Sequence, residues 1–188
     1  MFFYEFDIQT TSPVLLDGYS TVYLKIDSPD AYVKANEQYN LSGLLNTKKH
    51  FSKNNFCSLL FLNNEVVSSG WCAWDVSFYI PGLDLSLVLK DPQVCVLYDF
   101  MTLPSERGKG YYPLLLTEVI RNNPNLRKFI IYTYAPNTAS QKGITKAGFK
   151  LVGKFRHASP ELKGYLKKCN LTTGKSKHGL LNIIRSDI

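Results

Sequence analysis

The sequence predicts an α/β fold in which helices pack on the faces of a β-sheet. Two observations support this. In the second half of the chain, apolar runs typical of buried strands alternate with stretches of helical periodicity, an order that places helices against a sheet. The 188 residues are 45% hydrophobic and 13% aromatic, which is enough for a full core. With no internal repeat and no Pro- or Ser-rich linker, we expect residues 1–188 to form a single domain.

In the first half, four strands and one helix are expected. The strands are predicted at residues 2–8, 19–26, 56–62 and 65–74. Between the last two stands Asn63-Asn64, which is suited to a two-residue hairpin turn. Ser28-Pro29-Asp30 resembles a helix start with proline in the first turn, so we expect a helix from there to Leu45.

In the second half, strands and helices are expected to alternate after a Pro- and Gly-containing segment at 81–92. The predicted order is strand 94–103, helix 111–120, strand 128–135, helix 138–147, strand 150–155 and a last strand at 180–184. Gly148 is placed to end the second helix in a left-handed conformation. The lysine-rich segment 159–177 is expected to be a mobile loop.

The positive charge is concentrated in the last third of the chain. Residues 142–177 hold ten basic residues and the single acid Glu161, a net +9 against +7 for the whole chain, which leaves −2 for the rest. Such a surface is compatible with a solvated face, with nucleic acid, with an anionic membrane or with a small polyanion. Because the nearby aromatic residues are too sparse to form a stacking platform, nucleic acid is not an expected partner.

The cysteines and the apolar runs bear on metal binding and compartment. Cys57, Cys72, Cys95 and Cys169 are scattered, with no Cys-x-x-Cys and no histidine at ligand spacing, so we expect reduced, buried thiols and no metal. No apolar run approaches the roughly 20 residues that span a bilayer, and the first residues lack a basic leader region. We therefore expect a soluble, cytoplasmic protein without a membrane span.

The segment Arg107-Gly108-Lys109-Gly110-Tyr111-Tyr112-Pro113 lies between a predicted buried strand and a predicted helix. Its two glycines allow a tight curl, after which the N–H groups of the first helical turn can converge on an anion. Pro113 removes an N–H that the helix does not use. The segment therefore predicts a phosphate-binding loop, and a sharp strand-to-helix turn without a ligand is the alternative.

Two motifs in this region resemble those of the GNAT acetyltransferases. Arg107-x-x-Gly110, with Leu103-Pro104 upstream, resembles the pyrophosphate loop of that family, and Asn137-x-x-Ser140-x-x-Gly143-Ile144-x-x-x-Gly148-Phe149 has the spacing of its second conserved helix. The resemblance covers residues 94–153 closely and is greatest to members associated with bacterial polysaccharide biosynthesis. It implies a central mixed, mostly antiparallel twisted sheet of about six to seven strands with helices on both faces. It also implies that strands 94–103 and 128–135 splay apart.

The resemblance further implies a function and a set of cofactor contacts. An acetyl or short acyl group would move from acetyl-CoA, a co-substrate, to an amine by direct attack in a ternary complex, with an amino sugar as one candidate acceptor. Backbone groups of Met101 and Leu103 would pair with the pantetheine arm, and the N–H groups of Gly108 to Tyr112 would hold the pyrophosphate. Asn137 is equally placed as a helix cap. The predicted cofactor-binding residues are Met101, Leu103, Arg107, Gly108, Lys109, Gly110, Tyr111, Tyr112, Asn137 and Ser140.

The chain departs from the family pattern at two positions that bear on catalysis. Tyr112 stands where the loop usually has glycine or alanine, and Ile144 where many members have a tyrosine that protonates the departing thiolate. Asp99, the only carboxylate on strand 94–103, is the predicted base, with a hydrogen-bonded structural carboxylate as the alternative. Tyr132 and Tyr134 share a strand face from which a hydroxyl could reach the reacting atoms, and Tyr134 is the predicted second catalytic residue, with core packing of both tyrosines as the alternative.

The acceptor site is expected around the helix at 30–45, the loop 78–92 and the hairpin that carries Trp71 and Trp74, although at odd spacing these two cannot share one strand face. Because Ile144 replaces the tyrosine, a catalytically degenerate acyl-CoA-binding module is the alternative function. The sequence leaves the oligomeric state open, a dimer included.

Overall fold

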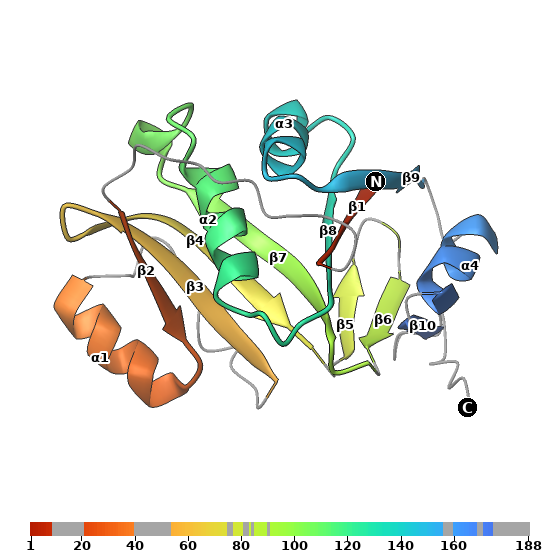
Figure 1. Ribbon diagram of the computed structural model, residues 1–188, viewed down its shortest axis with the longest axis horizontal. Helices are drawn as coiled ribbons and strands as arrows, with labels where there is room; N and C mark the ends of the chain where they lie inside the picture. Colours follow the sequence, from red (N-terminus) through yellow and green to blue (C-terminus); the bar gives the residue numbers. More distant parts are fainter. Residues whose placement is uncertain are drawn as a thin grey trace.

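The computed structural model describes residues 1–8, 21–39, 54–74, 77–80, 83, 85–89, 91–155, 160–168 and 171–174. Its centre is a seven-stranded sheet of order β2-β3-β4-β7-β8-β1-β9, in which only β7 and β8 run parallel (Figure 1). The strands are β1 Phe2–Asp7, β2 Thr21–Ile26, β3 Asn55–Leu62, β4 Glu65–Ala73, β7 Val94–Thr102, β8 Lys128–Thr133 and β9 Lys150–Lys154. The predicted mixed, mostly antiparallel sheet is confirmed.

The hairpin between β3 and β4 forms as predicted. Asn63 and Asn64 have φ of 51° and 65°, the two left-handed residues that a type I′ turn requires. This turn sets the pairing of Leu62 with Glu65 and carries the ladder on to Asn55 and Ala73. Asparagine tolerates the left-handed region better than most residues, which is why two of them can replace the usual Asn-Gly.

One face of the sheet is covered by helices α2 (Tyr111–Arg121) and α3 (Thr138–Lys146), and α2 crosses β3, β4 and β7 (Figure 1). The side chains buried beneath them are here named the α2 core. It includes Leu97, Leu115, Ile131, Ile144 and Phe149. At the end of α3, Gly148 has φ of 91° and Phe149 N donates to Ile144 O at 3.3 Å, so the predicted left-handed helix end is confirmed.

The opposite face is covered in two parts. Helix α1 (Pro29–Tyr39) packs over the β3 and β4 end, where the α1 core includes Ile26, Leu59 and Trp71. Over β7, β8 and β1 lies the α4 core, which includes Phe3, Val96, Ile130 and Leu162. This second part consists of α4 (Pro160–Lys168) and a three-stranded sheet of order β10-β6-β5, with β5 Ser77–Ile80, β6 Leu85–Leu89 and β10 Leu171–Gly174. Helices therefore lie on both faces, as predicted.

Two regions differ from the sequence prediction. The segment 81–92, expected only to separate two elements, contains β6, a short apolar run between prolines and glycines. The segment 159–177 was expected to be a loop but contains α4 and β10. In α4, Lys163 and Lys167 are exposed, whereas Leu162 and Leu166, four residues apart, are fully buried. The strand expected at 180–184 and the helix end at 40–45 lie outside the described residues.

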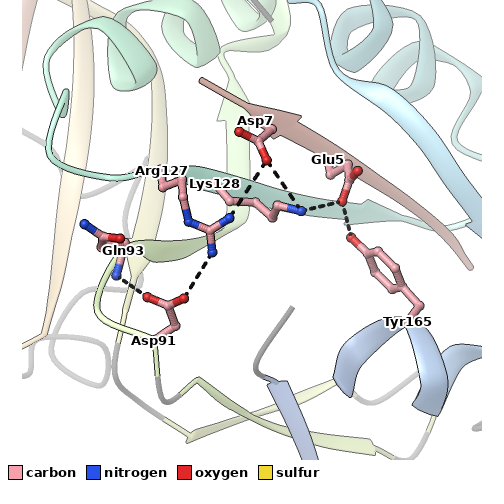
Figure 2. Close-up of polar contacts among 7 residues, drawn as sticks. All are labelled: Glu5, Asp7, Asp91, Gln93, Arg127, Lys128 and Tyr165. Carbon is pink, nitrogen blue, oxygen red and sulfur yellow. Dashed lines mark hydrogen bonds and ion pairs between the residues drawn. The ribbon is translucent and has the colours of Figure 1, made fainter. Parts of the chain in front are cut away.

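A network of charged side chains joins β1, β8 and α4 (Figure 2). Lys128 Nζ lies 3.2 Å from Glu5 Oε2 and 3.8 Å from Asp7 Oδ2. From α4, the Tyr165 hydroxyl donates to the same oxygen of Glu5 at 3.2 Å. The network extends through Arg127, Asp91 and Gln93 to the start of β7. It helps to hold α4 against β1 of the central sheet, since Lys128 is only 15% exposed and its ion pairs are partly shielded from water.

The cysteines match expectation where they are described: Cys57, Cys72 and Cys95 are free and buried, and Cys169 lies outside the described residues. Burial raises the pKa of the Cys72 thiol well above its ordinary value, so that thiol is protonated at neutral pH. In the part of the chain that the structure describes, no helix is long and apolar enough to cross a membrane.

Candidate functional site

The parallel strands β7 and β8 part halfway along their length. They pair from Val94 with Lys128 to Leu97 with Ile131, and the pairing then stops although β7 continues to Thr102 and β8 to Thr133. The predicted splay is therefore present. Two unpaired strand edges inside a sheet offer backbone donors and acceptors to an extended ligand, just as a sheet edge offers them to another strand.

A β-bulge on β7 lies where the strands separate. Ser69 pairs with Met101 and Trp71 with Tyr98, so Gly70 opposes two residues, Asp99 and Phe100. Asp99 has φ of 50°, a left-handed conformation that aspartate adopts more readily than most residues. A Cβ at Gly70 would meet the Phe100 ring at 2.4 Å, so the glycine makes room for that ring. The bulge re-aims the side chains on either side of it.

The hydrogen bonds of β7 show which backbone groups face the gap. Leu103 N donates to Val67 O at 3.0 Å and Met101 O accepts from Ser68 Oγ at 2.9 Å, so both residues direct backbone groups to the β4 side. Backbone direction alternates along a strand, which leaves Phe100 and Thr102 facing β8. Met101 and Leu103, which the resemblance implies as partners of a pantetheine arm, thus direct these backbone groups away from the gap. The motif spacing alone could not show this.

The loop after β7 has the form that the sequence predicts. A short 3-10 turn at Pro104–Glu106 leads into Gly108 and Gly110, with φ of 81° and 92°. Gly110 is the N-cap of α2 and its carbonyl accepts the first helical bond, from Leu114 N at 3.2 Å. The helix provides no carbonyl partners for the N–H groups of its first turn, and its dipole places partial positive charge there. The arrangement can bind an anion such as a phosphate.

The basic side chains of the loop lie beside this helix start. Arg107 Nε donates to Thr102 O at 3.3 Å, so the guanidinium folds back along the β7 edge that faces the gap. Lys109 Nζ lies 3.0 Å from Glu106 Oε1, and the lysine side chain is 52% exposed. Both cations therefore add positive charge next to the anion-binding turn, although the exposed Lys109–Glu106 pair is itself of little energetic value.

Tyr112 points to helix α3. A Cβ at Gly143 would lie 2.4 Å from Tyr112 Cδ1, so the ring rests on the glycine, and its hydroxyl lies 3.2 Å from Ser140 Oγ. On its other side the ring packs against Phe100, with centroids 5.9 Å apart. Burial raises the pKa of Tyr112 to about 12, partly offset by the Ser140 hydrogen bond, so the phenol is neutral. The bulk of Tyr112 is thus accommodated between the two helices.

Helix α3 carries two further positions that the sequence singled out. Asn137 Oδ1 accepts from Ser140 N at 3.0 Å, which makes Asn137 the N-cap of the helix. The structural role that the sequence left as an alternative is therefore present. Ile144 is fully buried in the α2 core, and its aliphatic side chain provides no hydroxyl at that position.

Asp99 and two tyrosines gather on the side of the sheet away from α2. Leu97 and Ile131 belong to the α2 core, so the next residues along each strand, Tyr98 and Tyr132, face the other way, against the α1 and α4 cores. Burial raises the pKa of both tyrosines, and the Asp99 carboxylate raises them further. Asp99 therefore acts electrostatically on tyrosines from both sides of the gap.

Of the residues predicted from sequence, the structure brings Asp99 close to Tyr132 and leaves Tyr134 beyond the end of β8, where it is 52% exposed. Sequence reasoning missed Tyr98 and Phe100, because the bulge that sets their directions depends on pairing with β4. The lone aspartate in an otherwise apolar strand was the one feature of the sequence that could have indicated the bulge. Trp71 is buried in the α1 core whereas Trp74 packs against the α2 core, so they point to opposite faces, as their spacing predicts.

No group of three or more histidine, cysteine or acidic side chains that could hold a metal ion occurs among the residues that the structure describes. No model of a known protein family matches the sequence, and no curated protein matches it.

Solved structures do match the fold. A GCN5-related N-acetyltransferase from Kribbella flavida is 11% identical, with a TM-score of 0.53 over 79% of this chain and 53% of that protein, so the chain spans about half of its length. AAC(6')-Iy, solved with a bisubstrate analogue of CoA, is 17% identical, with a TM-score of 0.51 over 72% of this chain and 95% of the other. At these identities the likeness shows the fold, and the chain has the GNAT fold.

Proposed function

We propose that this protein is an acyltransferase that moves an acetyl or short acyl group from acyl-CoA to an amine. The observation that carries the proposal is the pair of left-handed glycines, Gly108 and Gly110, at the start of α2, directly after a strand that has separated from its parallel neighbour. An anion-binding turn beside two open strand edges suits a ligand that has a diphosphate at one end and an amide-containing arm at the other.

Each part of acyl-CoA has a proposed partner. The N–H groups from Gly108 to Tyr112 would hold the pyrophosphate, with Arg107 and Lys109 adding charge. The backbone groups of Phe100 and Thr102, which face the gap, would pair with the amides of the pantetheine arm. Ser140 and Asn137, at the start of α3, would contact the cofactor further along. Acyl-CoA is consumed in this reaction, so it is a co-substrate, and we propose no metal.

In the proposed chemistry the amine attacks the thioester carbon directly within a ternary complex. Holding both reactants in place can lower the barrier by roughly 7 to 11 kcal/mol in favourable cases, and a positioned base adds roughly 10²- to 10⁴-fold. Asp99 is the proposed base because the bulge presents its exposed carboxylate where the strands part. Tyr134, half exposed beyond the end of β8, is proposed to contact the acceptor.

An amino sugar is the proposed acceptor class. AAC(6')-Iy, which shares this fold over 95% of its length, was solved with a bisubstrate analogue that joins CoA to acetylneamine. The motif resemblance to members associated with polysaccharide biosynthesis points to the same class. Because acetyl-CoA is an intracellular metabolite, the proposed activity belongs in the cytoplasm.

One observation favours a second candidate, a catalytically degenerate acyl-CoA-binding module: the buried Ile144 leaves no hydroxyl where many members of the fold have one. Calorimetry with CoA, followed by a free-thiol assay with acetyl-CoA and a panel of amino sugars, separates the two. Binding with turnover supports the enzyme, and binding without any turnover supports the module. Absence of CoA binding would overturn both.

The loop is tested by a matched pair of variants at Gly108. A Cβ there would meet nothing within 4 Å, so any effect comes from the backbone angle of +81°. Gly108→Val should weaken CoA binding by roughly tenfold or more, because a β-branched residue in a left-handed conformation costs about 1–2 kcal/mol and redirects the loop N–H groups. Gly108→Asn, which tolerates that conformation, should retain most of the affinity. Equal affinity in both variants would contradict the loop assignment.

A further inference from the structure

If acyl transfer takes place where β7 and β8 part, as the proposed function requires, the departing thiolate needs a proton. Ile144 cannot supply one. Tyr132 is the first residue of β8 beyond the last pair with β7, and Tyr98 is its counterpart on β7. Both hydroxyl-bearing side chains leave the sheet on the face that Asp99 influences. These are therefore the two tyrosines to compare as proton donors.

Tyr98 is committed elsewhere. Its ring stacks on Trp71 with centroids 6.5 Å apart, and the side chain of Asn55 hydrogen-bonds to its hydroxyl. That bond ties the Tyr98 hydroxyl to the start of β3, on the β4 side of β7 and away from β8. The Tyr98 side chain is thus held on the β4 side of β7 and is not directed across the gap.

Tyr132 has a fixed ring next to the gap. The ring packs on Phe3 of the adjacent β1, with centroids 5.7 Å apart and planes at 30°, and Phe3 is in turn held edge-on by Phe155. Asp99 from β7 and Tyr134 from the end of β8 both act electrostatically on the Tyr132 hydroxyl. Burial and the Asp99 charge both raise the pKa of Tyr132, so the phenol keeps its proton at neutral pH.

We propose that Tyr132 is the proton donor to the leaving thiolate and that Asp99 returns the proton to it. The amine nitrogen forms a bond to the acyl carbon, the C–S bond breaks with its electron pair on sulfur, and the Tyr132 hydroxyl gives its proton to that sulfur. Asp99 takes a proton from the amine nitrogen and passes it to the tyrosinate. One proton has then moved from amine to thiol, and both side chains are restored.

The test compares Tyr132→Phe with the wild-type protein, after turnover of acetyl-CoA with an amine acceptor has been measured for the wild type. We expect kcat with acetyl-CoA to fall roughly 10²-fold or more, the usual contribution of a positioned acid, with the dissociation constant for CoA unchanged. The rate of transfer from p-nitrophenyl acetate, whose leaving group departs without a proton, should change less than threefold, or about 0.6 kcal/mol. A merely structural role would depress both donors equally.

Two further variants complete the design. Tyr165→Phe removes a hydroxyl from the same face but outside the gap, so it should leave both rates unchanged. Asp99→Asn keeps a residue that tolerates the left-handed angle and is exposed, so it should fold even if Tyr132→Phe does not. If the two residues act in one proton cycle, Asp99→Asn combined with Tyr132→Phe should lose much less than the product of the single losses.

The outcomes separate the two proposals. If the wild type shows no turnover, the proposed function fails and this inference with it. If the wild type turns over and Tyr132→Phe has the same kcat with acetyl-CoA, or loses both donors equally, the inference alone fails. Simple multiplication of the Asp99→Asn and Tyr132→Phe losses would overturn the shared proton cycle.

Discussion

Gly143 of α3 provides a direct test of the contact between the two helices that cover the α2 core. An alanine Cβ there would lie 2.4 Å from Cδ1 and 2.9 Å from Cε1 of Tyr112. Carbon atoms in good contact are about 3.5–4.0 Å apart, so the ring would have to move by roughly 1 Å. It cannot swing aside freely, because it packs against Phe100 and its hydroxyl is bonded to Ser140.

Opposing effects decide the sign of the change in stability. In a helix interior, alanine is favoured over glycine by about 1 kcal/mol. Against this, an overpacked methyl group costs about 1–3 kcal/mol and a lost hydrogen bond between Tyr112 and Ser140 about 0.5–1.5 kcal/mol. We therefore expect Gly143→Ala to lower the free energy of unfolding by about 1–3 kcal/mol, measured by urea denaturation.

Gly164 in α4 is the matched control, because a Cβ there would meet nothing within 4 Å. Gly164→Ala should raise the free energy of unfolding by about 0.5–1 kcal/mol. In a Tyr112→Ala background, where the clash is gone, Gly143→Ala should become stabilising by about 1 kcal/mol. If Gly143→Ala stabilises the otherwise unchanged protein as much as Gly164→Ala does, the described contact between Tyr112 and Gly143 is wrong.

Three further predictions concern other contacts. Lys128→Met should lower the free energy of unfolding by about 1–3 kcal/mol, because it leaves Glu5 and Asp7 without their shared cation. An unchanged free energy of unfolding in urea titration would show that the network does not stabilise the fold. Burial holds the pKa of Tyr112 near 12, above its unfolded value, so its stabilising effect is complete below pH 10 and is lost as pH rises toward 12; in Tyr112→Phe, stability measured across that range should fall less steeply. Asn137→Ala should lower the free energy of unfolding by about 0.5–2 kcal/mol, and Asn137→Asp should change it little, so equal melting temperatures for the two variants would contradict the cap. Weaker CoA binding by the stable Asn137→Asp variant would support a cofactor contact.

The elements that the sequence predicts well are those whose signals are local. The hairpin at Asn63-Asn64 and the helix end at Gly148 depend on backbone angles that few residues adopt, so the residue type carries the information. The turn formed by Gly108 and Gly110 before α2 is predictable for the same reason. Strand β6 and helix α4 were missed because their stability comes from packing on β7, β8 and β1, and the lysines that dominate 159–177 conceal the buried pair Leu162 and Leu166.

The sequence motifs predict where the candidate site lies, but they do not predict which way its backbone groups and side chains point. The sequence indicates which strand and loop take part, yet Leu103 N donates to Val67, a pairing set by a strand more than 30 residues away. The proposed roles of Phe100 and Thr102 follow only from that pairing. Likewise, Tyr132 is the first residue of β8 beyond its last pair with β7, a position set by where the strands stop pairing, which no local pattern in residues 128–135 records.

The extra residue in β7 separates the chemistry of the site from the architecture around it. Without Asp99, the residues Leu97, Tyr98 and Phe100 would alternate between the two faces as in an uninterrupted strand, and their partners on β4 would still follow in order. Residue 99 is therefore the extra residue of the bulge, and the pairing of β4 with β7 does not depend on it. Any side chain that tolerates this backbone angle could stand there without changing the ladder, so the group presented where β7 and β8 part could change during evolution while the scaffold stayed the same.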